Sequence, residues 1–194
     1  MKSICVVVYL CLSTTLFAQS KNSTEDLLFW TPDYRLSGED FKGQIRHEDT
    51  LLLARSSETL THKLGTIITA LDVHVKTEWG KTTYTVRAAM NRSRSWIKNE
   101  GDTIVLRHEQ GHFDICEIYA RMLRRDIRKA KSLAEAKAIY NKTMDLEEIE
   151  HLAYDRENTY PLGGTTEAWA NKIQDRLQQL DTYKKAAVTV PVYR

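Results

Sequence analysis

Hydrophobic and polar residues alternate strictly in the middle of the chain. Over residues 71–79 every second residue is apolar or threonine, and over residues 82–90 the alternation returns with tyrosine, valine and alanine on one side. A period of two is typical of strands that bury one face. Gly80-Lys81 lies between the two stretches and can turn the chain. The pattern predicts an antiparallel hairpin.

From residue 102 onward, apolar residues recur every three or four positions, which is typical of helices. Asp102 or Thr103 can cap a first helix that reaches about Lys129. Ser132 begins a capping box that starts a second helix, and a third follows a loop at residues 161–164. The hairpin and these helices predict an α+β fold with a small antiparallel sheet, one long helix and two further C-terminal helices.

The N-terminus has the layout of a secretory signal peptide. Lys2 precedes a short apolar run, and Ala18 precedes polar residues. The run is too short to span a bilayer comfortably, although the bulky Leu16 leaves open an anchor that stays attached. We therefore expect an exported protein, periplasmic or secreted, without a membrane span once the signal is removed. The expected parts are a signal peptide (1–18), a flexible N-terminus (19–26), one domain (27–183) and a C-terminal tail (184–194).

Charge and cysteine content exclude some classes of protein. The formal net charge is only +2, which gives no argument for a nucleic-acid partner. The cations of a basic run at residues 121–131 are expected to complement a helix dipole, and an acidic run at residues 145–150 is expected to be a solvated face. Cys116 is the only cysteine after the signal, so an intramolecular disulfide is excluded, and we expect it to be a small core residue.

The stretch LRHEQGHFD, residues 106–114, places two histidines four positions apart. On a helix such a pair projects to one side, where His108 and His112 can bind one zinc ion. Glu109 follows the first histidine, as does the general base of zinc peptidases. The alternative is a pair of exposed helix histidines, against which Gly111 argues, because a glycine inside a helix usually marks close packing.

A catalytic zinc site normally takes three protein ligands, so a third must come from elsewhere in the chain. His47, His62 and His74 lie upstream, where we expect surface or strand histidines. The downstream candidates are Glu135, Glu147, Glu148, His151 and Asp155.

Four segments resemble a family of secreted, predicted zinc-dependent peptidases of Gram-negative bacteria, which is catalogued as a domain of unknown function. The segments are Trp30 with Leu36 and EDFKG (39–43), SW (95–96), LRHEQGHFDICEIYARML (106–123) and AYDREN (153–158). The resemblance implies a small zincin-like α+β fold, with His108 and His112 as zinc ligands and Glu109 as base. The family's C-terminal signature carries a histidine that would fall at Tyr160. Asp155, which does match, is our preferred third ligand, and the alternative is that Tyr160 coordinates weakly or steadies an oxyanion.

These observations predict an exported metallopeptidase that hydrolyses peptide bonds by a zinc-activated water, with Glu109 as general base. A peptide or protein substrate would lie along an edge strand within residues 71–90. The main alternative is a non-catalytic periplasmic binding protein whose metal site is degraded or structural. A further alternative is metal-dependent hydrolysis of a non-peptide bond.

Overall fold

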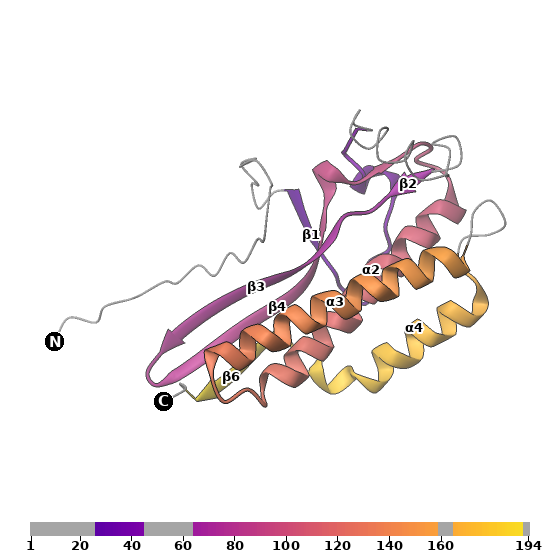
Figure 1. Cartoon of the computed structure of the whole chain (residues 1–194). Coiled ribbons are helices and arrows are strands. Elements are labelled where there is room, and N and C mark those ends of the chain that lie inside the picture. Colours follow the sequence, from indigo (N-terminus) through magenta and orange to yellow (C-terminus); the bar gives the residue numbers. More distant parts are fainter. Residues whose placement is uncertain (1–25, 45–63, 159–164, 192–194) are drawn as a thin grey trace.

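Strand β4 (Lys81–Asn91) is the centre of the sheet (Figure 1). The computed structural model describes residues 26–44, 64–158 and 165–191. Strand β3 (Thr69–Glu78) pairs with β4 along one side. On the other side, β1 (Leu27–Phe29) pairs with the C-terminal end of β4 and β6 (Ala187–Pro191) with its N-terminal end. All these pairings are antiparallel, and β6 lies within the residues that we expected to form a tail.

The β3–β4 hairpin is confirmed, but its turn lies one residue earlier than expected. Glu78 pairs with Lys81, so the turn consists of Trp79 and Gly80. Both have positive φ angles, of 51° and 72°, as in the two-residue turns whose twist matches that of paired strands. Trp79 is 93% exposed and does not continue the buried face of β3.

The described residues form three α-helices: α2 (Thr103–Ile127), α3 (Leu133–Glu157) and α4 (Glu167–Gln179). The N-cap of α2 is Asp102, one of the two residues that the sequence predicts, and that of α3 is Ser132, as predicted. The N-cap of α4 is Thr166. The α+β class, the small antiparallel sheet and the three helices are therefore as predicted. None of the helices in the described ranges is long and apolar enough to cross a membrane.

Helix α2 is the central element of the fold. It contacts β3 and β4 on one side and α3 and α4 on the other (Figure 1). Its apolar residues, such as Phe113, Ile115 and Ile118, are almost fully buried, and so is Cys116, as we expected. Residues on α2 are thus held on both sides by packing.

Shorter elements complete the described chain. Strands β2 (Gly65–Thr66) and β5 (Trp96–Ile97) form a separate two-stranded antiparallel sheet beside the N-terminal half of α2. Three short 3₁₀ helices are η2 (Gly38–Asp40), η3 (Arg92–Arg94) and η4 (Asp181–Tyr183).

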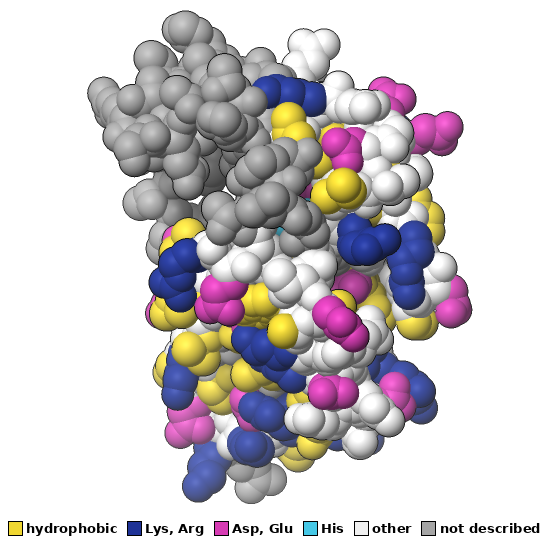
Figure 2. Space-filling model, turned by 90° about the vertical axis from the view of Figure 1, so that its right-hand side faces the viewer, with side chains coloured by type: hydrophobic (Ala, Val, Ile, Leu, Met, Phe, Trp, Pro, Cys, Tyr) yellow, Lys and Arg dark blue, Asp and Glu magenta, His cyan; other side chains and the backbone are white. Residues whose placement is uncertain are grey.

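The basic run is only partly exposed to solvent, although Arg124 and Arg125 lie in the last turn of α2, as expected for cations that complement its dipole. Arg121 and Arg124 are 4% and 2% exposed. Both bind the buried carboxylate of Glu117, at 2.9 Å and 3.0 Å. Arg124 also donates to the carbonyl oxygen of Val86 at 2.9 Å and so ties α2 to β4. These charges lie inside because a carboxylate and carbonyl oxygens satisfy them there. The face in Figure 2 carries both signs of charge interspersed with hydrophobic side chains.

Candidate metal centre

Both histidines of the motif point at one carboxylate of the neighbouring helix. Nε2 of His108 lies 3.1 Å and Nε2 of His112 lies 2.8 Å from Oδ1 of Asp155. Helix α3 runs antiparallel beside α2 and so carries Asp155 to a position opposite the two rings (Figure 1). The structure thus brings together the three residues that we predicted as ligands.

The spacing of these side chains fits a metal ion. One ligand atom from each residue lies within 4.8 Å of the others. Tetrahedral zinc with bonds of about 2.0–2.1 Å separates its ligand atoms by about 3.3 Å. The present distances of 2.8 Å and 3.1 Å to Oδ1 need a small opening, and the remaining separation, within 4.8 Å, needs to close where it exceeds this value. Two imidazoles and a carboxylate are also the donor types of a catalytic zinc site with one position for water or substrate.

The cluster opens to solvent on the side of the carboxylate. The side chain of Asp155 is 55% exposed, whereas those of His108 and His112 are 18% and 11% exposed. Burial of its inner part by itself raises the pKa of Asp155, but hydrogen bonds from the two imidazoles outweigh this and hold the pKa well below its usual range. An ionised carboxylate that solvent can reach is suited to bind a cation.

Tyr154 holds the two imidazoles in place and was not singled out from the sequence as a site residue. Its ring stacks on His108, with centroids 4.9 Å apart, and meets the ring of His112 edge-on at 4.8 Å. Its hydroxyl donates to the carbonyl oxygen of His108 at 3.1 Å and makes a short hydrogen bond with Thr165. Burial raises the pKa of Tyr154 far above its usual value, so the phenol stays protonated and acts as a donor.

Gly111 is required by the same tyrosine. A Cβ atom at this position would lie 2.5 Å from Cζ of Tyr154 and even closer to its hydroxyl. This explains why a glycine stands in the middle of α2, and it confirms the close packing that we predicted. The spacing between glycine and tyrosine could not be predicted, because the two lie on different helices.

Glu109 lies beside the cluster rather than within it. It is one residue from His108, so its side chain is turned about 100° from the ligand face. Its Oε2 accepts a hydrogen bond from the backbone N–H of Ile67 at 3.0 Å, and the residue is 4% exposed. Gly65 approaches it so closely that a Cβ there would lie 3.0 Å from Oε1. The connection from β2 to β3 therefore covers and orients this carboxylate.

Several other candidate ligands lie away from the cluster or outside the described residues. Glu135 accepts from the backbone of Lys131 at the start of α3, and Glu148 is exposed. His74 lies on β3 with its side chain 56% exposed and pairs with Asp72. Tyr160, His47 and His62 lie outside the described residues, so the predictions made for them stay predictions.

Two further candidates lie on the side of His112 that faces away from Asp155. His151 contacts His112, and Glu147 contacts His151. Nδ1 of His151 lies 2.8 Å from Nδ1 of His112, on the ring edge away from Asp155. Nε2 of His151 lies 3.5 Å from Oε1 of Glu147, which is 4% exposed. The acidic run is therefore not fully solvated, contrary to our expectation. The sequence does contain a signal, because residues 147, 151 and 155 are spaced by four, like 108, 112 and 116.

The segments quoted for the family resemblance meet around α2. The indole N–H of Trp30 donates to Asp114 at 2.7 Å, and the side-chain oxygen of Gln110 accepts from the backbone of Leu36 at 2.9 Å. Gly43 donates to the carbonyl oxygen of Ser95 at 2.8 Å. The N-terminal segment thus fastens the half of α2 that carries the histidines.

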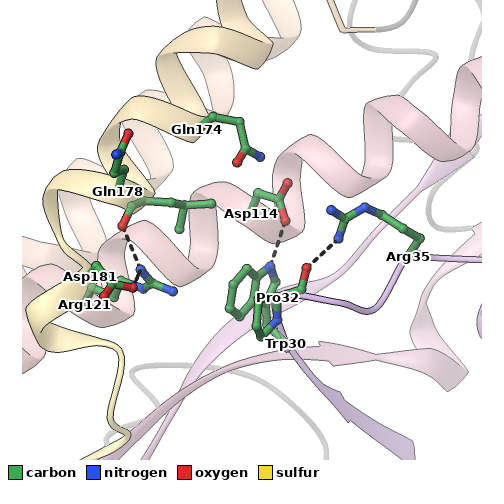
Figure 3. Close-up of a pocket in the computed structure, with 9 residues that line it drawn as sticks. Trp30, Pro32, Arg35, Asp114, Arg121, Gln174, Gln178 and Asp181 are labelled. Carbon is green, nitrogen blue, oxygen red and sulfur yellow. Dashed lines mark hydrogen bonds and ion pairs between the residues drawn. The ribbon is translucent and has the colours of Figure 1, made fainter.

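A separate cleft of about 370 Å³ lies between the N-terminal segment, α2 and α4. Trp30 and Asp114 line it between Arg35 on one side and Arg121 on the other (Figure 3). Burial raises the pKa of Asp114, against the effect of its hydrogen bonds from Trp30 and Gln110. His108, His112 and Asp155 are not among its lining residues.

Three kinds of comparison bear on the identity of the chain. No known family model, curated protein or solved structure matches it. The likeness to secreted zinc peptidases therefore remains a prediction from the sequence.

Proposed function

We propose that this protein is an exported zinc-dependent metallopeptidase of zincin-like organisation, with His108, His112 and Asp155 as the metal ligands. The observation that carries the proposal is the convergence of both histidine Nε2 atoms, at 3.1 Å and 2.8 Å, on one solvent-exposed carboxylate. Both imidazoles share Oδ1 of Asp155, although hydrogen bonding alone would also be satisfied by a bond to each of the two carboxylate oxygens. A cation between them satisfies all three groups.

The chain's own residues supply the remaining parts of a hydrolytic site. When bound, zinc provides a Lewis acid that polarises a scissile carbonyl and lowers the pKa of a water molecule. Glu109 accepts the proton of the attacking water, and the N–H of Ile67 fixes the orientation of its carboxylate. Tyr154 stacks on His108 and keeps the ligand rings in place.

A peptide substrate can be held by its backbone. Strand β3 pairs only with β4 among the described residues, and a peptide could add a strand at its other edge. The connection from β2 to β3 lies next to Glu109, because the backbone N–H of Ile67 donates to its carboxylate. We place the substrate along this part of the edge, at the beginning of β3 rather than at the exposed hairpin tip.

Metal analysis and one isosteric substitution test the proposal. The purified mature protein is expected to contain one zinc ion per chain, and Asp155→Ala to lose it. Glu109→Gln should retain zinc and lose peptide hydrolysis, because the amide cannot accept the proton. Glu148→Gln, an exposed change on α3, is the matched control. Unchanged turnover by Glu109→Gln would refute the mechanism.

A second function is favoured by one observation. Glu109 is 4% exposed and already accepts a backbone hydrogen bond, so a metal-containing but non-catalytic binding protein fits the same geometry. Stoichiometric zinc without hydrolysis over a broad panel of peptide and ester substrates supports this function. Hydrolysis that requires Glu109 excludes it.

Export is the part of the proposal that rests on the sequence alone. The layout of residues 1–18 predicts cleavage after Ala18. N-terminal sequencing of the protein from the cell envelope and medium tests it, and an uncleaved N-terminus would favour a retained anchor.

A further inference from the structure

The polar contacts of the metal centre continue into the interface between α2 and α3. On both helices the contacting residues are four positions apart, so each set forms a row along one helix face. Because the helices are antiparallel, the two rows meet in opposite order. The rows are His108, His112 and Cys116 on α2, and Asp155, His151 and Glu147 on α3.

The ring of His112 is held at both of its nitrogens. Nε2 lies 2.8 Å from Oδ1 of Asp155, and Nδ1 lies 2.8 Å from Nδ1 of His151. A hydrogen bond between two ring nitrogens needs a proton on one and a lone pair on the other. If Nε2 of His112 uses its lone pair to bind a metal ion, its proton resides on Nδ1, which then donates to His151.

The same assignment of ring protons extends to the contact between His151 and Glu147. A neutral His151 that accepts at Nδ1 carries its proton on Nε2, which faces Oε1 of Glu147 at 3.5 Å. Among the described residues neither Nε2 of His151 nor Oε2 of Glu147 has a hydrogen-bond partner. Burial and the neighbouring carboxylate of Glu147 raise the pKa of the Cys116 thiol. A buried carboxylate with so few partners costs stability, which points to a role other than stabilising the fold.

This geometry also excludes His151 as a fourth ligand in the present arrangement. Its Nδ1 lies at the edge of the His112 ring opposite to the edge that faces Asp155. We infer that His151 and Glu147 are positioning residues, which fix the proton of His112 on Nδ1 and so present Nε2 to the metal ion. The inference rests on the proposed zinc site. Partners of this kind typically change metal affinity by about 10–100-fold.

Three substitutions separate this role from simple packing. His151→Leu removes the acceptor, so zinc affinity should fall by about 10–100-fold. His151→Asn places an amide oxygen near the former Nδ1 and should retain most of the affinity. Glu147→Gln preserves the shape of the side chain but removes its charge. We expect it to lower zinc affinity less than His151→Leu does. Glu148→Gln, exposed on the same helix, should bind zinc like the wild type.

Zinc affinity is measured by competition with a chromophoric chelator, and the melting temperature of each metal-free variant reports folding. Long-range ¹H–¹⁵N NMR spectra of the zinc-loaded wild type should show His112 protonated on Nδ1 and His151 on Nε2. Unchanged affinity in His151→Leu, or an unprotonated Nδ1 on His112, overturns this inference and leaves the zinc site intact. A wild-type protein that binds no zinc overturns both.

Discussion

Gly111→Ala distinguishes local helix preference from tertiary packing, because the two predict effects of opposite sign. In an isolated helix, alanine is favoured over glycine by about 1 kcal/mol. In this structure the new methyl group would lie 2.5 Å from Cζ of Tyr154, which is far inside a van der Waals contact. The ring of Tyr154 is 0% exposed and packs against Trp169 as well as the histidines, so it has little room to move.

The size of the effect follows from three contributions. Overpacking a buried site costs about 1–3 kcal/mol. Displacement of the ring also breaks the hydrogen bonds of the Tyr154 hydroxyl to His108 and Thr165, at about 1 kcal/mol each. After the gain in helix propensity, the free energy of unfolding should fall by about 2–4 kcal/mol. For a chain of this length the melting temperature should fall by roughly 5–15 °C.

Urea and thermal unfolding of the metal-free protein measure this change. Gly101→Ala is the matched control, because its Cβ would meet only the side chain of Asn99, at 3.6 Å. Zinc affinity of Gly111→Ala should fall as well, since Tyr154 stacks on His108. A Gly111→Ala protein as stable as the wild type, or more stable, would refute the packing argument.

Three other predictions follow from buried charges and from the proposed zinc. Glu117→Gln leaves Arg121 and Arg124 without their counter-charge and should lower the free energy of unfolding by about 3–5 kcal/mol, measured in urea; a loss below about 1 kcal/mol would contradict it. Burial opposes ionisation of Glu150, but hydrogen bonds from Arg176 and other donors outweigh it and lower its pKa from 4.5. Glu150→Gln should therefore be less stable than wild type at pH 7, and the difference should shrink below about pH 4.5, as the carboxylate protonates; a gap that is constant between pH 7 and pH 3 would contradict it. Removal of zinc by a chelator should lower the melting temperature, because zinc at 100 times its Kd stabilises the folded state by about 2.7 kcal/mol; an unchanged melting temperature would contradict the site.

Much of the fold could be predicted because its signals are local. The alternation that predicts β3 and β4 and the capping residues Asp102 and Ser132 act within a few residues of themselves. The sequence predicts the turn one residue too late, because Trp79 continues the apolar alternation of β3. The pairing of Glu78 with Lys81 instead leaves Trp79 and Gly80 as a two-residue turn. β6 was missed because five residues near the C-terminus gain their partner only from β4.

The candidate site divides in the same way. The spacing of His108 and His112 predicted that both side chains project from the same face of one helix. Asp155 was predicted as a ligand from its place in the segment AYDREN (153–158). The contact between them depends on how α3 packs on α2, as do the roles of Tyr154 and His151. The sequence holds the spacing of four on both helices but not the register between them.

The sequence by itself therefore determined the helices, the hairpin, the near-neutral charge and the pair of histidines on one helix face. Each depends on interactions between residues close together in the chain. Only the tertiary structure decided that Asp155 faces this pair, that Gly111 makes room for Tyr154, and that Glu147 and Arg124 are buried. The physical reason is that burial and side-chain contacts between elements depend on helix register and on dense packing, which no short segment encodes alone.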